Sequence, residues 1–360
     1  MASTSTTEAP SKSSASAAEP RRPLGVLDPR SWLRPSAVTT EDGTRAGHTG
    51  IVDRILDLGI YVALIALVLY FAIASPYFLT QRNLINVGYA VAVTGILAAG
   101  MTIALIAGQL DLTVGANVGL VTVTVALLIT NGYSPVIAVL AGLAVGAVIG
   151  LCNTVLVVRL GINSIIATLA FSLALRGLAL ILTNGQVKPL VKPQLQDFIT
   201  ARFLGIPVSV YVLIVVFLVA WVVLSFTRSG WHIYGVGGNA SAALRSGIRV
   251  RRVYMAVFMS TGILAAIGGV ITAGNAGSGG PNYANGTEFD FLTAVLLGGI
   301  GLAGGSGKMQ RTLAGVLVIG VLNNGLTLLS VDTYYQQLAR GAVFVLAVIL
   351  GAISERRRAR

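Results

Sequence analysis

Long apolar segments separated by short polar turns occupy the chain from about residue 56 to residue 353. Each segment holds roughly 17 to 25 residues, enough for a helix rising about 1.5 Å per residue to cross about 30 Å of hydrocarbon. Because the segments are apolar throughout instead of alternating apolar and polar positions, they are not strands of a membrane barrel. The pattern predicts ten transmembrane helices, near residues 56–75, 88–107, 112–130, 135–158, 163–183, 208–226, 253–273, 288–303, 310–329 and 335–353.

The eighth predicted span, residues 288–303, is the least regular of the ten. It runs into GGIGLAGGSG, residues 298–307, where the glycines can end the helix early or let the chain turn back inside the protein. We therefore expect an all-α integral membrane bundle of about ten helices, with this segment as its weakest member.

The composition agrees with a membrane protein. Hydrophobic residues make up 55% of the chain and charged residues 11%, which is too little polar surface to cover a soluble domain. Residues 1–50 are rich in Ser, Thr, Ala and Pro without an apolar period, so we expect a disordered cytoplasmic tail there. A transmembrane permease domain at residues 51–353, with a long inside loop at 227–252, and a basic cytoplasmic tail at 354–360 complete the expected organisation.

The net charge of +12 is explained by its placement along the chain. With ten spans both termini lie on one side. If that side is cytoplasmic, nineteen Lys and Arg fall in inside segments and four in outside loops. This asymmetry follows the positive-inside rule and predicts a multi-pass protein of the cytoplasmic membrane with both termini inside. It gives no reason to expect a nucleic-acid partner.

A lone acid, Asp111, lies in GQLDLTVG between the second and third predicted spans. A carboxylate at mid-bilayer costs about 2.5 to 3.5 kcal/mol, so such a residue normally faces protein or water. Gly108 can end one helix, and Asp111 can cap the next by accepting the N–H of Thr113 or Val114. Capping and a direct role in a transport pathway both remain open, and they are compatible.

Other polar residues interrupt the later spans. Arg176 can reach the interface, pair with an acid or line a pathway. Asn323 and Asn324 can tie helices together by hydrogen bonds or line a pore. Glu288 and Asp290, just before the eighth span, are expected to cap that helix start, with contact to a solute from outside as the alternative.

No sequence pattern indicates an enzyme, a cofactor or a metal site. GLAGGSGKM resembles a phosphate-binding loop, but Leu302 replaces its first glycine and Met309 its hydroxyl residue. The single cysteine, Cys152, cannot form a disulfide within one chain or a zinc site, and two histidines make a catalytic triad implausible.

The inside loop contains a candidate docking element. Asn239 can cap a short helix, NASAALRS, whose one face is alanine and which lies between Gly238 and Gly247. Such a helix can dock into a groove on another protein, and the alternative is an ordinary basic loop.

Several motifs in order resemble the permease subunits of bacterial ABC importers for monosaccharides, the ribose type. GQLDLTVGANVGL is similar to the family signature G-G-x-D-L-S-V-G. It is followed by TLAFSLALRGLALILTNGQ, YGVGGNASAALRSGIRVRRV, GTEFDFLTAVLLGGIGLAGGSG and GVLNNGLTLLSV, so the resemblance covers about residues 50–353. Gln109 stands where the family has glycine and Thr113 where it has serine, which leaves the backbone at that junction less certain.

The resemblance implies a dimer of permeases, two ATPase subunits beneath it and a sugar-binding protein outside. It also implies that the inside loop carries the coupling helix that seats in the ATPase. The matching residues are Gly237, Gly238, Asn239, Ala242, Ser246, Gly247 and Ile248, and Ala243 is the position whose replacement by a bulky charged residue should abolish uptake.

We expect import by alternating access, with a neutral sugar passing loosely spaced polar groups. The candidate pathway residues are Gln109, Asp111, Thr113, Arg176, Asn323 and Asn324. A nucleoside permease and a secondary transporter acting alone are the alternatives, although few ionisable residues in the spans could carry a coupled proton.

Overall fold

The computed structural model describes the backbone of residues 46–358 and the side chains of residues 59–349 and of Gly351. Residues 1–50 and 51–360 form separate units, and the packing described below lies within the second. Residues 1–45 of the expected tail, and residues 359–360, lie outside the described part. The described helices are α1 (Ala46–Ala74), α2 (Gln81–Ile106), α3 (Val114–Thr130), α4 (Pro135–Thr154), the π-helical η2 (Val155–Arg159), α5 (Ser164–Thr183), α6 (Gln194–Thr200), α7 (Val208–Phe226), α8 (Arg228–Gly238), α9 (Ala240–Arg245), α10 (Val250–Ala276), α11 (Thr287–Leu297), α12 (Met309–Leu328) and α13 (Thr333–Arg358).

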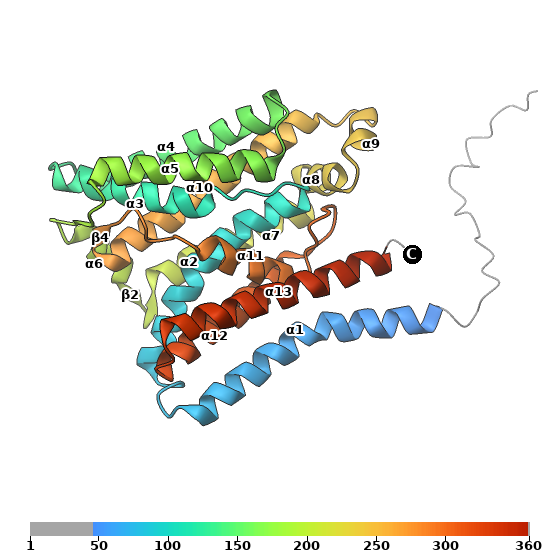
Figure 1. The fold of residues 1–360 in the computed structure, drawn as a ribbon, viewed down its shortest axis with the longest axis horizontal. Helices are drawn as coiled ribbons and strands as arrows, with labels where there is room; N and C mark the ends of the chain where they lie inside the picture. Colours follow the sequence, from blue (N-terminus) through green and yellow to red (C-terminus); the bar gives the residue numbers. More distant parts are fainter. Residues whose placement is uncertain (1–45, 359–360) are drawn as a thin grey trace, which may run out of the picture. The chain divides into compact units, whose positions relative to one another are not determined.

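Four strands of two residues each form two small antiparallel pairs. β1 (Lys188–Pro189) pairs with β4 (Ser278–Gly279), and β2 (Arg202–Phe203) pairs with β3 (Ile206–Pro207). These pairs lie at one end of the helical bundle, together with α6, whereas α8 and α9 lie at the opposite end (Figure 1).

The count of ten spans that the sequence predicts is not confirmed. In the described residues, six helices are long and apolar enough to cross a membrane, namely α2, α4 with η2, α5, α7, α10 and α12. The apolar part of α1, Gly59–Ala74, and α3 are shorter. The eighth predicted span, 288–303, ends early, as its glycines allow: α11 ends at Leu297, and its 11 residues rise only about 16 Å. Gly298 to Gly307 continue as a loop, with Gly299 at φ 77°.

Local capping explains where several helices begin. Ser134 accepts the N–H of Ile137 at 3.4 Å, and Pro135 occupies the first turn of α4, where no partner for its nitrogen is needed. Thr80 and Asn163 cap α2 and α5 in the same way. These caps satisfy N–H groups that would otherwise be unpaired at the helix ends.

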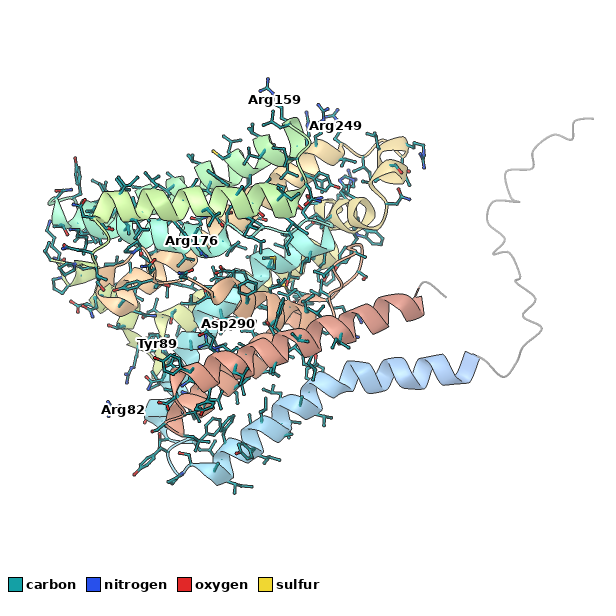
Figure 2. All side chains as sticks on the ribbon, in the orientation of Figure 1. Arg82, Tyr89, Arg159, Arg176, Arg249 and Asp290 are labelled. Atoms are coloured by element: carbon teal, nitrogen blue, oxygen red, sulfur yellow. The ribbon has the colours of Figure 1, made fainter. Side chains whose placement is uncertain are left out.

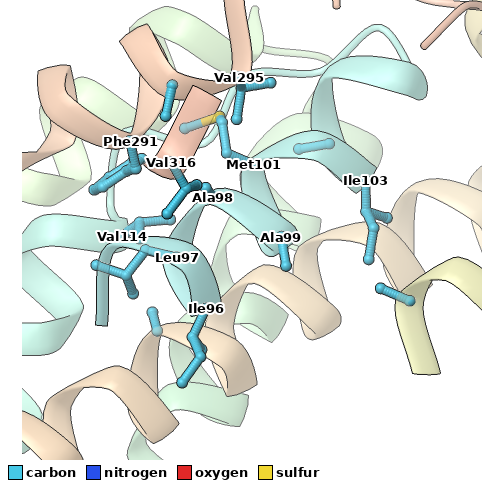
Figure 3. Packing of buried hydrophobic residues seen from close by; sticks show 14 of the residues in the cluster. Ile96, Leu97, Ala98, Ala99, Met101, Ile103, Val114, Phe291, Val295 and Val316 are labelled. Carbon is cyan, nitrogen blue, oxygen red and sulfur yellow. The ribbon is translucent and has the colours of Figure 1, made fainter. Parts of the chain in front are cut away.

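Helices α2 and α10 form the centre of the bundle. α10 packs against α4, α3 and α2, and α2 also packs against α7 and α12 (Figure 1). Figure 3 shows the apolar core that α2 makes with the facing helices, in which Met101 and Val316 are fully buried. Its labelled members are Ile96, Leu97, Ala98, Ala99, Met101, Ile103, Val114, Phe291, Val295 and Val316.

Glycines allow α4 and α10 to approach backbone to backbone. A side chain at Gly146 would collide with the Gly262 carbonyl, and one at Gly150 with the Phe258 carbonyl. Membrane helices associate without a hydrophobic driving force between them, and small residues at their crossings let the backbones pack closely.

Candidate functional site

The chain between α2 and α3 holds Asp111 at the centre of a buried hydrogen-bond cluster. Asp111 is fully buried. Its Oδ1 accepts from the Thr113 N–H at 3.0 Å, the Thr113 hydroxyl at 2.5 Å and the Asn153 amide at 3.2 Å. Its Oδ2 accepts from the Thr261 hydroxyl at 2.5 Å. The bond to the Thr113 N–H is one of the two that the sequence predicts, but Asp111 does not cap α3, whose N-cap is Thr113 without a side-chain bond. The cluster joins this junction to α4 and α10.

Hydroxyl groups of α5 satisfy the irregular backbone around Asp111. Leu110 N–H donates to the Ser164 hydroxyl at 3.3 Å, and Leu112 N–H donates to the Thr168 hydroxyl at 3.1 Å. Gln109, which the sequence suggests as a pathway residue, lies near enough to the Tyr254 hydroxyl on α10 for their side chains to interact. Asp111, Thr113 and Gln109 therefore all engage neighbouring helices.

Two ion pairs flank α11. The Arg176 guanidinium on α5 donates to Glu288 Oε1 at 2.6 Å, and the Arg340 guanidinium on α13 donates to Asp290 Oδ2 at 3.2 Å. Residues two apart on a helix point to opposite sides, so α11 is held from both sides. Both acids lie in the first turn of α11, where an acid is favourable, but neither caps the helix, because the N-cap is Gly286 without a side-chain bond.

Both ion pairs lie between the two ends of the bundle. Figure 2 shows Arg176 and Asp290 between Arg82 and Tyr89 at one end and Arg159 and Arg249 at the end that carries α8 and α9. The arginines of the pairs are partly exposed, with 25% of the Arg176 side chain and 32% of the Arg340 side chain accessible. Charges that remain partly open inside a membrane bundle normally face water or another protein surface.

The adjacent residues Asn323 and Asn324 have different environments. Asn324 and Asn83 exchange two hydrogen bonds at 2.9 and 3.0 Å, which tie α12 to α2. Asn323 lies within hydrogen-bonding reach of Asp290, and its own Oδ1 has no partner among the described residues. Only Asn323 of the two belongs to the ion-pair region.

The expected docking helix is present as α9. Asn239 accepts the Ala242 N–H at 2.9 Å, which is the cap that the sequence predicts. Ser246 donates its hydroxyl to the Ala242 carbonyl at 3.1 Å, and Gly247 at φ 83° ends the turn. The Ile248 N–H then returns to the Ala243 carbonyl at 3.0 Å.

The orientation of α9 corrects the choice of Ala243 as an exposed contact. Ala243 is 5% exposed and belongs to the bundle core, whereas Leu244 is 64% exposed. A bulky charged residue at Ala243 would therefore lift α9 off its own bundle, so it does not test docking alone. Leu244 and Trp231, which is 74% exposed on α8, are the large apolar residues at this end that sequence reasoning missed.

Three glycine-containing segments converge beneath α9. A side chain at Gly237 would collide with the Ile106 carbonyl and with the Gly305 nitrogen, and one at Gly304 would come within 2.8 Å of Gly108. The Gly305 N–H donates to the Ile106 carbonyl at 2.8 Å. The end of α2, the end of α8 and the loop after α11 thus touch backbone to backbone.

A tyrosine adds a side-chain contact to this convergence. The Tyr234 hydroxyl on α8 donates to the Gly307 carbonyl at 2.8 Å. Partial burial raises the pKa of Tyr234 above its usual value, which keeps the phenol protonated as a donor.

The sequence did not predict the partners of Arg176 and Asp111, because these partners lie far away along the chain. Glu288 lies 112 residues from Arg176, and Thr261 lies 150 residues from Asp111. Asn153 and Thr261 are polar residues inside apolar runs, and that is the signal that could have drawn attention to them. No group of three or more His, Cys, Asp or Glu that could hold a metal ion occurs among the described side chains.

Comparison with known proteins gives a consistent assignment. Residues 83–348 match the model of the family described as branched-chain amino acid transport system / permease component. The ribose import permease protein of Escherichia coli (strain K12) is 38% identical over 293 residues, covering 80% of this chain and 91% of that protein.

Two further relatives cover the chain to a similar extent. The ribose import permease protein of Bacillus subtilis (strain 168) is 40% identical, covering 81% of this chain and 92% of that protein. The L-arabinose ABC transporter permease protein of Azospirillum brasilense is 34% identical, covering 88% of this chain and 92% of that protein. No solved structure matches the chain. The chain belongs to the branched-chain amino acid transport system / permease component family.

Proposed function

We propose that this chain is the transmembrane permease subunit of an ATP-driven ABC importer that moves a monosaccharide across the bacterial cytoplasmic membrane. The observation that carries the proposal is the similarity along four fifths of the chain to permeases named for ribose and, with 34% identity, for L-arabinose. The chain is a multi-pass membrane protein and is not itself an enzyme, because the partner ATPase hydrolyses ATP. A binding protein outside the membrane delivers the sugar.

The charges inside the bundle favour a neutral solute. Arg176 and Arg340 each have an acidic partner, so the ion-pair region carries no net charge. A zwitterionic amino acid would call for uncompensated groups of both signs in its path. Both acids of this region are also paired with an arginine, which is less favourable for a coupled proton and argues against a secondary transporter acting alone.

The proposed mechanism is alternating access driven through α9. ATP binding closes two ATPase subunits, α9 is pushed, and two permease copies change from inward to outward opening. Arg159 and Arg249 lie at the end that carries α9 (Figure 2), which supports a cytoplasmic location of that end. We also propose, from the distribution of Lys and Arg along the chain, that both termini are cytoplasmic. Lipid surrounds the apolar faces of the bundle.

Deletion and complementation in the native host test the transport function. We expect loss of the reading frame to abolish ATP-dependent uptake of radiolabelled D-ribose or L-arabinose, and the restored chain to recover it. L-leucine and uridine serve as comparison solutes. Loss of leucine or uridine uptake with both sugars unaffected would replace the proposed substrate class.

A second experiment tests the role of α9. Leu244→Asp places a charge on the exposed side of α9, where it would meet an apolar groove of the ATPase, so we expect uptake to fall about tenfold or more with normal membrane levels. Ser241→Asp, on the same short helix and exposed, is a control for added charge alone. Normal uptake and normal co-purification of the ATPase with Leu244→Asp would remove the docking assignment.

A further inference from the structure

Three buried polar atoms around α11 have no hydrogen-bond partner among the described residues. They are Glu288 Oε2, Asn323 Oδ1 and Arg340 Nε. Unsatisfied groups of this kind each cost about 1 to 3 kcal/mol, so proteins rarely leave them without a purpose. Here the three come from three helices, α11, α12 and α13, that pack against one another.

Glu288 is the most enclosed of the three. The residue is 9% exposed, and one carboxylate oxygen binds Arg176 while the other is unpaired. The unpaired Oε2 points towards the first turn of α3, where a side chain at Gly115 would lie 2.8 Å from it. Even a methyl group at Gly115 would crowd this oxygen, so the glycine keeps Oε2 free of a side-chain contact from α3.

On the other side of α11, Asp290, Arg340 and Asn323 form the second half of the region. Asp290 accepts from Arg340 at 3.2 Å and lies within hydrogen-bonding reach of Asn323, while Asn323 Oδ1 and Arg340 Nε remain unused. The two halves lie on opposite sides of the same short helix, near enough for the charges of Glu288 and Asp290 to interact.

α11 is too short to cross the membrane. It resembles the interrupted helices that line solute sites in many transporters. Interrupted helices commonly place solute groups near the membrane midplane, where their ends and polar side chains are accessible. Arg176 and Asp290 lie between the two ends of the bundle (Figure 2), which agrees with such a depth.

The unused atoms have the chemistry of a polyhydroxylated neutral solute. Each hydroxyl group both donates and accepts, and the region offers two acceptors and one donor with no net charge. We propose that Glu288 Oε2, Asn323 Oδ1 and Arg340 Nε bind hydroxyl groups of the monosaccharide as it passes α11. This inference rests on the proposed transport function and names the side chains that would carry it out.

A double substitution separates binding from folding. Glu288→Leu alone leaves Arg176 unpaired, so we expect low membrane levels. Arg176→Leu with Glu288→Leu replaces the ion pair by apolar side chains, a change that is commonly tolerated, so we expect the protein level to recover. Uptake by the double variant should still be about tenfold or more below the wild type per molecule, because the hydroxyl-binding oxygen is gone.

Accessibility of the two neighbouring asparagines gives a readout that is independent of transport rate. In a Cys152→Ser background, Asn323→Cys and Asn324→Cys are treated with a membrane-impermeant methanethiosulfonate reagent in unsealed native membranes supplied with ATP. We expect the cysteine at position 323 to react at least about tenfold faster, because only this position faces the solute path.

The outcomes distinguish this inference from the transport proposal. D-ribose or L-arabinose is used as the probe, according to which of them the wild-type chain imports. Wild-type uptake by the double variant, or equal reactivity at the two positions, would overturn the hydroxyl-binding assignment while leaving the transport function intact. If the wild-type chain imports neither sugar, the transport proposal itself fails.

Discussion

Two polar clusters in this bundle differ in how completely their acids are hydrogen-bonded, although Asn153 Oδ1 beside Asp111 also lacks a partner among the described residues. Around Asp111 every carboxylate oxygen accepts hydrogen bonds from protein groups, and the acid is fully buried. Around α11 two acids have arginine partners, yet polar atoms are left over and the arginines are partly exposed. An acid inside a membrane protein is thus a functional candidate only after its hydrogen bonds are counted, and by that count α11 is the stronger candidate.

The largest expected effect is the loss of the Asp111 cluster. Asp111→Ala removes the acceptor of the Thr113 N–H and opens a cavity, so we expect the free energy of unfolding to fall by about 3 kcal/mol or more. Thermal unfolding of the detergent-purified protein measures it. Asp111→Asn retains one acceptor oxygen and should lose less.

Asp111 would be assigned a role in transport, like the acids of α11, if Asp111→Ala changed uptake but not stability. An unfolding midpoint equal to wild type, combined with lost sugar uptake, would make the Asp111 carboxylate a transport group and would remove the contrast between the clusters.

The second-largest effect is expected where the end of α8 contacts the end of α2 and the loop after α11. Gly237→Ala forces a methyl group against the Ile106 carbonyl, and we expect overpacking to cost about 1 to 3 kcal/mol of stability. Gly238→Ala is the matched control, since the atom nearest to its added methyl is 3.9 Å away. Equal unfolding midpoints for the two variants would show that the convergence tolerates more space than the structure allows.

The smallest effect separates the neighbouring asparagines. Asn324→Ala removes the reciprocal bonds with Asn83, and we expect a loss of about 1 kcal/mol in the free energy of unfolding. Asn323→Ala should change stability by less than about 0.5 kcal/mol but lower sugar uptake. A reversed order of the two unfolding midpoints would contradict the division of roles between them.

Local features of the fold were predictable, and long-range ones were not. The cap at Asn239 and the Asp111 bond to Thr113 depend on residues two or three apart, so the sequence predicts them directly. The early end of α11 was visible as a run of glycines, although the sequence did not decide whether that segment crosses the membrane. The burial of Ala243 was not predictable, because the face of α9 that turns towards the bundle depends on the tertiary packing of that helix.

The candidate site shows the same division. Polar residues in apolar runs drew attention to Arg176 and Asn323, but several arrangements remained open for each. Their partners lie on helices whose packing decides which atoms meet, and no local pattern relates Arg176 to Glu288. The difference between Asn323 and Asn324 depends on a rotation of about 100° around α12, which an apolar run with little amphipathic character does not define.

The convergence of Gly108, Gly237 and Gly305 has a dynamic consequence. Side chains absorb small displacements by changing rotamer, but peptide groups in direct contact have no rotamers to change. A shift of α8 by even a fraction of an ångström must therefore move the end of α2 or the loop that follows α11 by a comparable amount. Motion that begins at the α9 end of the bundle reaches both polar clusters without being damped on the way.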